Sequence, residues 1–342
     1  MNPVLRVDLD AFAANLARIR SRVEPAQHML VVKDDAYGHG LAQIVRRAWS
    51  EGVRWFGAFD VRTGADVRRI LGADARIFVW IAASDAEVRT ALDLDLDIGV
   101  GDVSLLEDVG RLAKERPARV HLKIDTGLHR NGIRPEAWDA ATRRAAELEA
   151  SGAIEVTGIW SHLAEASDDE DDAAAAVFTS ALDTARRAGL SPSIRHLTAS
   201  AASFERPEFR GDLVRVGAFA YGIRPAGGPD EDELGIRPIA TLSAPVTRVD
   251  AEGVHVAIGS LHGLPSTLAG AVQVGTPVGP RRLVSVGALE SVIEPWREAL
   301  RGDEISVYGE GASSATDLAE ALGTIGEEIA VRVSPLVPRE SV

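Results

Sequence analysis

Short apolar segments rich in β-branched and aromatic residues recur along the chain, and most of them are followed by a helical pattern. The predicted strands are residues 28–33, 54–59, 76–81, 96–101, 119–125, 154–163, 194–200 and 213–222. Helical patterns lie at about 40–51, 62–71, 84–92, 102–115, 135–151 and 169–188. Apolar strands that alternate with helices are typical of a parallel sheet covered on both faces. The strand count favours a closed (β/α)₈ TIM-like barrel, and an open doubly wound sheet is the alternative.

The pattern changes near residue 236, where strands and turns replace this alternation. Strands are predicted within 236–249, 271–278, 282–289 and 303–309, and one helix is predicted at 317–323. We therefore predict an α/β protein of two domains, a barrel over residues 1–238 and a smaller, mostly β domain over residues 239–342. Before this boundary, residues 227–235 are predicted to form an acidic loop. Residues 167–176 are predicted to be the acidic start of a helix, which the helix dipole favours, with a metal site as the alternative.

Composition excludes several classes of function. The chain has 342 residues and a formal charge of −14, which argues against a general binder of nucleic acid or of anionic membranes. It contains no cysteine, so disulfides, thiolate metal sites and cysteine nucleophiles are excluded. It shows no signal-peptide pattern, and no apolar run approaches the ~18 residues of a membrane span. We therefore expect a cytoplasmic protein that acts on a small molecule.

Polar and cationic residues stand where the predicted barrel strands end. They are Lys33, Tyr37, His39, Lys123, Asp125, His129, Arg130, His162, Ser200, Arg215 and Gly217. Active-site groups of such barrels lie at the carboxyl ends of the strands, so we expect these residues to converge. Taken singly, each has a structural explanation, such as a solvated lysine or an arginine paired with Asp125 or Asp212. Taken together, so many cations in an acidic protein indicate an anionic ligand.

This set of side chains suits the chemistry of pyridoxal phosphate (PLP). A lysine amine can form a Schiff base with an aldehyde, and partial desolvation favours the neutral amine that attacks. Asp34 and Asp35 would oppose that effect if they pointed inward, so both are expected to face away. The phosphate needs a hydroxyl and backbone N–H groups, which Ser200, Tyr37 and the turn at Gly217 could supply.

Several stretches match, in order, the motifs of one family. They are VVKDDAYGHG (31–40), KIDTGLHRNG (123–132), GIWSHLA (158–164), HLTASAA (196–202), VRVGAFAYG (214–222) and the segment 313–339. In these stretches the chain resembles alanine racemases, PLP enzymes of fold type III that combine an N-terminal barrel with a C-terminal β domain. The resemblance implies an isomerase that interconverts L- and D-alanine or a related amino acid. It also implies a homodimer in which the β domain of one subunit covers the barrel mouth of the other.

The resemblance assigns a role to each cofactor-binding residue. Lys33 carries the PLP Schiff base and moves one proton at Cα. Tyr37 and Ser200, with the backbone of Gly217 and Ala218, bind the phosphate.

The same resemblance places four further side chains around the cofactor ring. Arg215 faces the pyridine nitrogen, and His162 is hydrogen-bonded behind it. Arg130 contacts the phenolic oxygen, and Lys123 stands where many members carry a carbamylated lysine. No metal ligand is implied.

The C-terminal domain departs from the family pattern. The family's second base is a tyrosine supplied by the partner subunit, and Ser260 of IGSLHGL (258–264) stands in its place. The chain has three tyrosines, and none of Tyr37, Tyr221 and Tyr308 replaces that base by position. Other departures are Ala199 and the Asp34–Asp35 pair in the barrel, and Leu289, Glu290 and Pro335 after it. His262 is the predicted substitute base, because an imidazole with a pKa near ~6.5 suits proton transfer, and Glu290 is a weaker candidate.

Three functions follow from this mixture of matches and departures. The first is a diverged amino-acid racemase that uses His262 or another group as second base. The second is a one-base PLP enzyme, such as a lyase, a decarboxylase or a stereospecific exchanger, in which Lys33 works on one face alone. The third is a PLP-binding paralogue without catalysis.

Overall fold

The computed structural model describes residues 2–342, which divide into two compact units. Unit 1 comprises the N-terminal residues to Arg18, Asp34–Arg47 and Ala218–Val342, and unit 2 comprises Ile19–Lys33 and Ala48–Gly217. Each unit contains one eight-stranded sheet. The predicted domain boundary at residue 238 stays a prediction.

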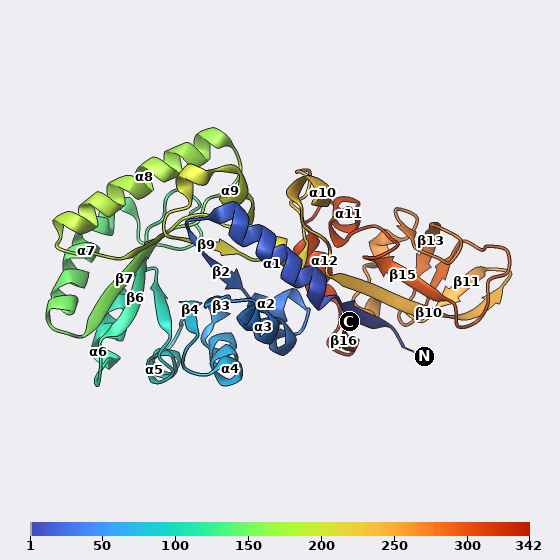
Figure 1. Cartoon of the computed structure of the whole chain (residues 1–342), viewed down its shortest axis with the longest axis horizontal. Coiled ribbons are helices and arrows are strands. Elements are labelled where there is room, and N and C mark those ends of the chain that lie inside the picture. The colour runs from blue at the N-terminus through green and yellow to red at the C-terminus, as the bar shows by residue number, and fades with distance from the viewer. Residues whose placement is uncertain (1) are drawn as a thin grey trace. The chain divides into compact units, whose positions relative to one another are not determined.

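The sheet of unit 2 is the predicted parallel barrel (Figure 1). Its strands follow the order β8-β7-β6-β5-β4-β3-β2-β9. Backbone hydrogen bonds from Asp212 N to Arg195 O (2.9 Å) and from Arg215 N to Thr198 O (3.2 Å) link β9 to β8 and nearly close the barrel. The strands are β2 (Gln27–Val31), β3 (Trp55–Asp60), β4 (Arg76–Ile81), β5 (Asp97–Val100), β6 (Ala118–Lys123), β7 (Ile154–Trp160), β8 (Ile194–His196) and β9 (Leu213–Val216).

Helices cover the outside of this barrel and begin at short polar caps. In Figure 1 they lie around the strands, and successive helices from α4 to α8 pack on each other. Asp60 ends β3 and accepts a hydrogen bond from Thr63 N, which starts α4, and Ser84, Asp102 and Ser167 cap α5, α6 and α8 in the same way. The helices are α4 (Val61–Leu71), α5 (Asp85–Asp93), α6 (Val103–Leu112), α7 (Pro135–Ala150), α8 (Asp168–Arg187) and α9 (Ser200–Glu205), followed by the 3₁₀ turn η1 (Pro207–Phe209).

The interior of the barrel is filled by large side chains. A buried cluster joins Met29, Trp55, Phe78, Trp160 and Leu213 from five different strands. The barrel is therefore a packed core, and its reactive groups are confined to the strand ends.

Unit 1 carries a mixed sheet that brings the two ends of the chain together. β1 pairs in parallel with β16 and antiparallel with β10, although these strands come from opposite ends of the sequence. The sheet runs β12-β13-β14-β11-β10-β1-β16, and β15 also pairs with β10. Its strands are β1 (Val4–Val7), β10 (Ala240–Asp250), β11 (Gly253–Val256), β12 (Gln273–Val274), β13 (Arg281–Val286), β14 (Ser291–Ile293), β15 (Glu304–Tyr308) and β16 (Arg339–Ser341).

Some elements of the structure differ from the prediction, and others were not predicted. The predicted helix at 317–323 is α11 (Ala315–Glu320), and the predicted acidic loop contains α10 (Glu231–Leu234), which starts at a capping box on Asp230. No element was predicted before residue 28, where the structure has β1 and α1 (Leu9–Val23). Within residues 2–342, no helix combines the length and apolar character needed to cross a bilayer. The remaining elements are α3 (Leu41–Ser50), η2 (Ala218–Tyr221), η3 (Ser260–His262), η4 (Ser266–Leu268) and α12 (Gly326–Arg332).

The segment after Lys33 forms a left-handed turn. Labelled α2 (Lys33–Tyr37), it has φ of 53°, 55°, 55° and 56° at Asp34, Asp35, Ala36 and Tyr37. For residues with a Cβ this conformation costs roughly 1–2 kcal/mol each, so tertiary contacts must hold it. Asp34 and Asp35 are exposed, as predicted, and Asp35 Oδ1 accepts a hydrogen bond from Leu41 N (2.7 Å) at the start of α3.

Candidate active site

Four cationic side chains act on one imidazole at the carboxyl ends of the barrel strands. His162 follows β7, and burial lowers its pKa far below the usual range. The positive charges of Arg215, Arg130, Lys123 and Lys33 lower the pKa of His162 further, in that order. The structure therefore brings these predicted residues together, and His162 is a neutral imidazole in a cationic site.

Arg215 is the buried centre of this site. Its Nη1 donates to His196 O (3.0 Å), and its Nη2 donates to Ser161 O (2.8 Å) and Leu197 O (2.9 Å). Nη2 also lies 3.2 Å from Nδ1 of His162. Burial lowers the pKa of the guanidinium to about 9.

Arg215 does not form the ion pair that would explain it structurally. Asp212 binds Arg195 instead, with a distance of 2.8 Å between Asp212 Oδ2 and Arg195 Nε. Asp125 Oδ2 lies 3.0 Å from His129 Nδ1. The positive charge of Arg215 is thus held by carbonyl oxygens and imidazole nitrogens.

Lys123 is a second buried cation of the site. It ends β6, is 6% exposed, and its Nζ lies 4.6 Å from the centre of the Trp160 ring. Burial lowers the pKa of its amine to about 8, the charges of Arg215 and Arg130 act in the same direction, and Asp125 opposes them. Arg130 itself is exposed in the loop after β6. Lys123 therefore supplies more neutral amine near pH 8 than an ordinary lysine would.

Two hydroxyl groups follow β8. Ser200 opens α9, and its Oγ accepts a hydrogen bond from Gly217 N (3.3 Å). Its own O–H is then directed elsewhere as a donor. Thr198 is fully buried, and among residues 2–342 its hydroxyl has no hydrogen-bond partner. These groups add uncharged donors to the cationic site.

The tyrosines of the chain are all buried. In unit 1 the rings of Tyr37 and Tyr221 lie 4.7 Å apart, and the ring of His39 stacks on Tyr221 at 5.0 Å. Tyr308 lies buried in β15. Burial raises the pKa of all three phenols. None of them is an exposed phenol of the kind that the family pattern requires for a partner's site.

The segment in which the resemblance predicts the replacement of the family tyrosine is the 3₁₀ turn η3 of unit 1. Ser260 is exposed, and His262 is half-buried, which lowers its pKa. Nδ1 of His262 accepts a hydrogen bond from Gly259 N (3.1 Å). Three other predicted departures lie in the same unit: Leu289 and Pro335 are exposed, and Glu290 accepts a hydrogen bond from the Thr247 hydroxyl (2.6 Å).

Sequence and fold comparisons place the chain among known proteins. The family model described as the alanine racemase N-terminal domain matches residues 7–225. This chain belongs to the alanine racemase family.

The match to individual alanine racemases extends over nearly the whole chain. The alanine racemase of Thermobifida fusca is 35% identical over 98% of this chain and 96% of its own length, and that of Beutenbergia cavernae is 36% identical over 98% and 97%. The crystal structure of the alanine racemase from Streptomyces lavendulae gives a TM-score of 0.94 at 31% identity, with 100% of this chain and 97% of that one covered. That of Streptomyces coelicolor gives 0.95 at 31% identity, covering 100% and 98%.

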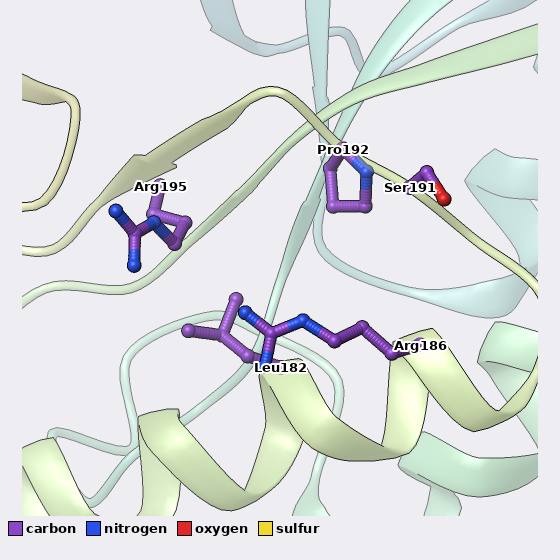
Figure 2. Close-up of a pocket in the computed structure, with 5 residues that line it drawn as sticks. All are labelled: Leu182, Arg186, Ser191, Pro192 and Arg195. Carbon is purple, nitrogen blue, oxygen red and sulfur yellow. The ribbon is translucent and has the colours of Figure 1, made fainter.

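A separate pocket of about 270 Å³ lies between the end of α8 and the start of β8 (Figure 2). It is lined by Leu182 and Arg186 of α8 and by Ser191, Pro192 and Arg195, which precede or begin β8. Its two arginines are already paired, Arg186 with Asp183 (2.7 Å) and Arg195 with Asp212 (2.8 Å). We assign it no part in the site of this alanine racemase family member.

Sequence reasoning missed two histidines beside the predicted site. His121 lies on β6 two residues before Lys123, and His196 ends β8 two residues before Thr198. Because strand residues alternate between faces, His121 and Lys123 share the inner face of the barrel. That alternation was the available signal.

Proposed function

We propose that this protein is a PLP-dependent amino-acid racemase of the alanine type. The observation that carries the proposal is the convergence of Lys33, Lys123, Arg130 and Arg215 on His162 at the carboxyl end of the barrel. It is supported by membership of the alanine racemase family, whose relatives named above are alanine racemases.

The residues of the barrel fit an anionic cofactor such as PLP. The cations and the hydroxyls of Ser200 and Thr198 form a donor set suited to a phosphate and a phenolate oxygen. We propose that Lys33 holds the cofactor aldehyde, and that Ser200 and Tyr37, with Gly217 and Ala218 N–H, hold its phosphate. When bound, PLP draws electrons from Cα and so acidifies the Cα proton of an amino acid.

The side chains around the ring then have distinct tasks. Arg215 is a donor that keeps its proton, so it hydrogen-bonds a ring nitrogen without protonating it. Arg130 contacts the phenolic oxygen. Lys123, with its pKa lowered to about 8, offers the neutral amine that carbamylation by CO₂ requires. Lys33 takes or returns the proton on one face of Cα.

The second face of Cα needs its own proton carrier, and the buried tyrosines do not supply one. His262 is the candidate that the sequence offers. However, Nδ1 of its ring accepts the Gly259 N–H, so a neutral ring carries its proton on Nε2 and donates there. To take a proton at Nε2 the ring must change tautomer and lose that hydrogen bond. This geometry favours a second candidate function, the one-base PLP enzyme in which Lys33 alone exchanges the Cα proton.

We propose that the active form is a homodimer. Leu261, Leu289 and Leu336 of unit 1 are 62%, 61% and 86% exposed. Their segments adjoin, because Leu261 N donates to Ala288 O (3.0 Å) and Ser334 N donates to His262 O (3.0 Å). An exposed apolar patch of this kind fits a protein partner, and a second copy is the partner that the family suggests. The absence of cysteine is compatible with a reducing cytoplasm, which we propose as the location.

Isotope exchange tests these proposals directly. The purified protein is given PLP in D₂O and each enantiomer of a panel of amino acids, and the products are read by chiral chromatography and mass spectrometry. Deuterium uptake with inversion supports the racemase. Uptake with retention, or a product without the original skeleton, supports the one-base enzyme. A visible spectrum of bound PLP with no exchange contradicts both and supports a non-catalytic paralogue.

A further inference from the structure

Two histidines lie completely buried inside the barrel and touch each other. His121 and His196 are both 0% exposed, and Nδ1 of His121 lies 2.8 Å from Nε2 of His196. Phe78 packs on both rings at 4.9 and 5.3 Å, and Trp160 stacks on His196 at 5.5 Å. Burying two polar rings among aromatic side chains is unfavourable unless their nitrogens are satisfied. The pair therefore calls for an explanation in its hydrogen bonds.

The absence of a side chain at Gly158 leaves room for the His121 ring. Gly158 on β7 lies opposite His121 on β6, and a Cβ at Gly158 would be 2.3 Å from Nδ1 of His121. Any side chain at position 158 would displace the ring. The imidazole of His121 is thus built into the barrel.

Arg215 determines where the protons of the two rings lie. A guanidinium only donates, and Nη1 of Arg215 lies 3.2 Å from Nδ1 of His196. Nδ1 of His196 must therefore accept, so its neutral ring carries the proton on Nε2 and donates to His121. Nδ1 of His121 then accepts, so the second ring also carries its proton on Nε2.

The series of side chains that begins at Arg215 leads through His196 and His121 to a buried carboxylate. Nε2 of His121 lies 3.5 Å from Oδ1 of Asp97, which is long for a hydrogen bond but close for a charge facing an N–H dipole. Asp97 is fully buried and binds Arg76 (2.6 Å) and Arg119 (3.2 Å). Burial alone would raise the pKa of Asp97, but the interactions with His121 and Arg76 outweigh burial and lower the pKa. A negative charge at this end favours the Nε2 proton on His121.

We propose that Asp97, His121 and His196 are positioning residues that hold Arg215 in a single orientation: Arg215 donates to His196, His196 donates to His121, and the carboxylate of Asp97 faces the N–H of His121. The terminal nitrogens of Arg215 face His196, Ser161, Leu197 and His162, which leaves Nε–H as the donor for a ligand. If His196 took the other tautomer, its Nδ1–H would oppose an N–H of Arg215. The identity of that ligand as the PLP ring nitrogen rests on the proposed function. The series formed by Asp97, His121 and His196 does not depend on the proposed function.

The tautomers can be measured in the protein without cofactor. Long-range ¹H–¹⁵N correlation spectra of ¹⁵N-histidine-labelled protein, recorded from about pH 6 to about pH 9, report the protonated nitrogen of each ring. His121→Gln and His196→Asn variants assign the two rings. We expect each ring to carry its proton on Nε2. A proton on Nδ1 of either ring would overturn the proposal.

Kinetics with PLP separate positioning from packing. We expect His196→Leu, which removes the acceptor for Arg215, to lower kcat about 10- to 100-fold while KM changes little. His196→Asn keeps an acceptor near the Nδ1 position and should recover most of the loss. His28→Leu is the matched control. His28 is a buried barrel histidine that contacts Val216 O (3.3 Å) and is not part of the series from Asp97 to Arg215.

Two results contradict the proposal in this second experiment. One is a His196→Asn variant that recovers nothing, and the other is an equal loss in His28→Leu. If wild-type protein neither binds PLP nor exchanges a Cα proton, the proposed function fails, whereas the tautomer spectra still decide whether the series from Asp97 to Arg215 exists.

Discussion

The two units of this protein place their unusual side chains in opposite ways. The barrel of unit 2 buries polar groups, with His121, His196 and Asp97 at 0% exposure in its interior. Unit 1 exposes apolar groups, with Leu261 at 62% and Leu336 at 86%. The groups of this buried polar set contact one another and neighbouring residues of the same chain. The exposed apolar set is not covered by described residues of this chain, and the proposed homodimer would cover it.

This difference separates the region whose contacts lie within one copy of the chain from the region that leaves apolar side chains exposed. The hydrogen bonds that hold Arg215 in the barrel all come from residues of the same chain. The departures from the family pattern predicted at Ser260, Leu289 and Pro335 lie in unit 1, and all three residues are exposed. Changes that alter the reaction are thus expected at the exposed surface of unit 1, while the barrel keeps the cofactor site.

The largest effect is expected at Lys33. In the Lys33→Ala variant we expect turnover to fall by on the order of 10³-fold or more, because both the covalent attachment and one proton carrier are lost. The visible absorbance of added PLP and the exchange of the Cα proton measure the two losses. Lys114→Ala, at an exposed lysine, is the control. If Lys33→Ala still exchanged the Cα proton, the active site would have to lie outside the barrel.

A smaller effect is expected at Gly158, where the buried polar series meets the backbone. Gly158→Ala places a Cβ 2.3 Å from the His121 ring, and overpacking of this kind typically lowers the free energy of unfolding by about 1–3 kcal/mol. Urea denaturation measures it. Gly189→Ala is the control, because its Cβ meets nothing within 4 Å and only its positive φ is unfavourable. Equal losses in both variants would show that the polar series tolerates displacement.

The pH dependence of stability tests the buried cation at Lys123. Its pKa in the folded protein is about 8, against 10.5 for the model amine, so between these values the unfolded chain binds the proton that the folded chain has released. The free energy of unfolding should therefore rise with pH from about 8 to 10.5, relative to Lys123→Met. Urea titrations in CO₂-free buffers across that window measure the difference. A flat difference would place the amine in water.

The smallest effect on stability is expected at Leu336. Because it is 86% exposed, Leu336→Ser should change the unfolding free energy of one chain by less than about 0.5 kcal/mol. The same variant should weaken self-association, which light scattering over a dilution series measures. Leu300→Ser, at a leucine that is 65% exposed, tests whether the effect is specific to this patch. A wild-type monomer at all concentrations would contradict the proposed dimer.

The barrel could be predicted from sequence because its elements are local. Each predicted strand overlaps an observed one, and the helices differ by only a few residues at their ends. The sheet of unit 1 could not be predicted in the same way. Val4–Val7 is too short to stand out, and it becomes a strand only by pairing with Ala240–Ser243 and Arg339–Ser341, far along the chain.

The charged residues of the candidate site could be predicted from the sequence, but the residues that position them were missed. Lys33, Lys123, Arg130 and Arg215 stand at strand ends, and counting along the sequence finds them. The orientation of Arg215 depends on His196, which the sequence presents as an ordinary strand residue. Likewise, nothing in the letters of Ala36 and Tyr37 signals a positive φ, since tertiary contacts impose it.

The left-handed turn after Lys33 has a consequence for the order in which the protein matures during synthesis. Gly38 O accepts a hydrogen bond from Arg339 Nε (2.9 Å), and the Cβ position of Gly38 lies 2.8 Å from Ala330 O. Lys33 leaves the ribosome long before Ala330 and Arg339, the residues that brace its neighbouring turn. We therefore expect a nascent chain to present Lys33 in its final setting only after Arg339 has been synthesised, so that cofactor loading reports that late stage of synthesis.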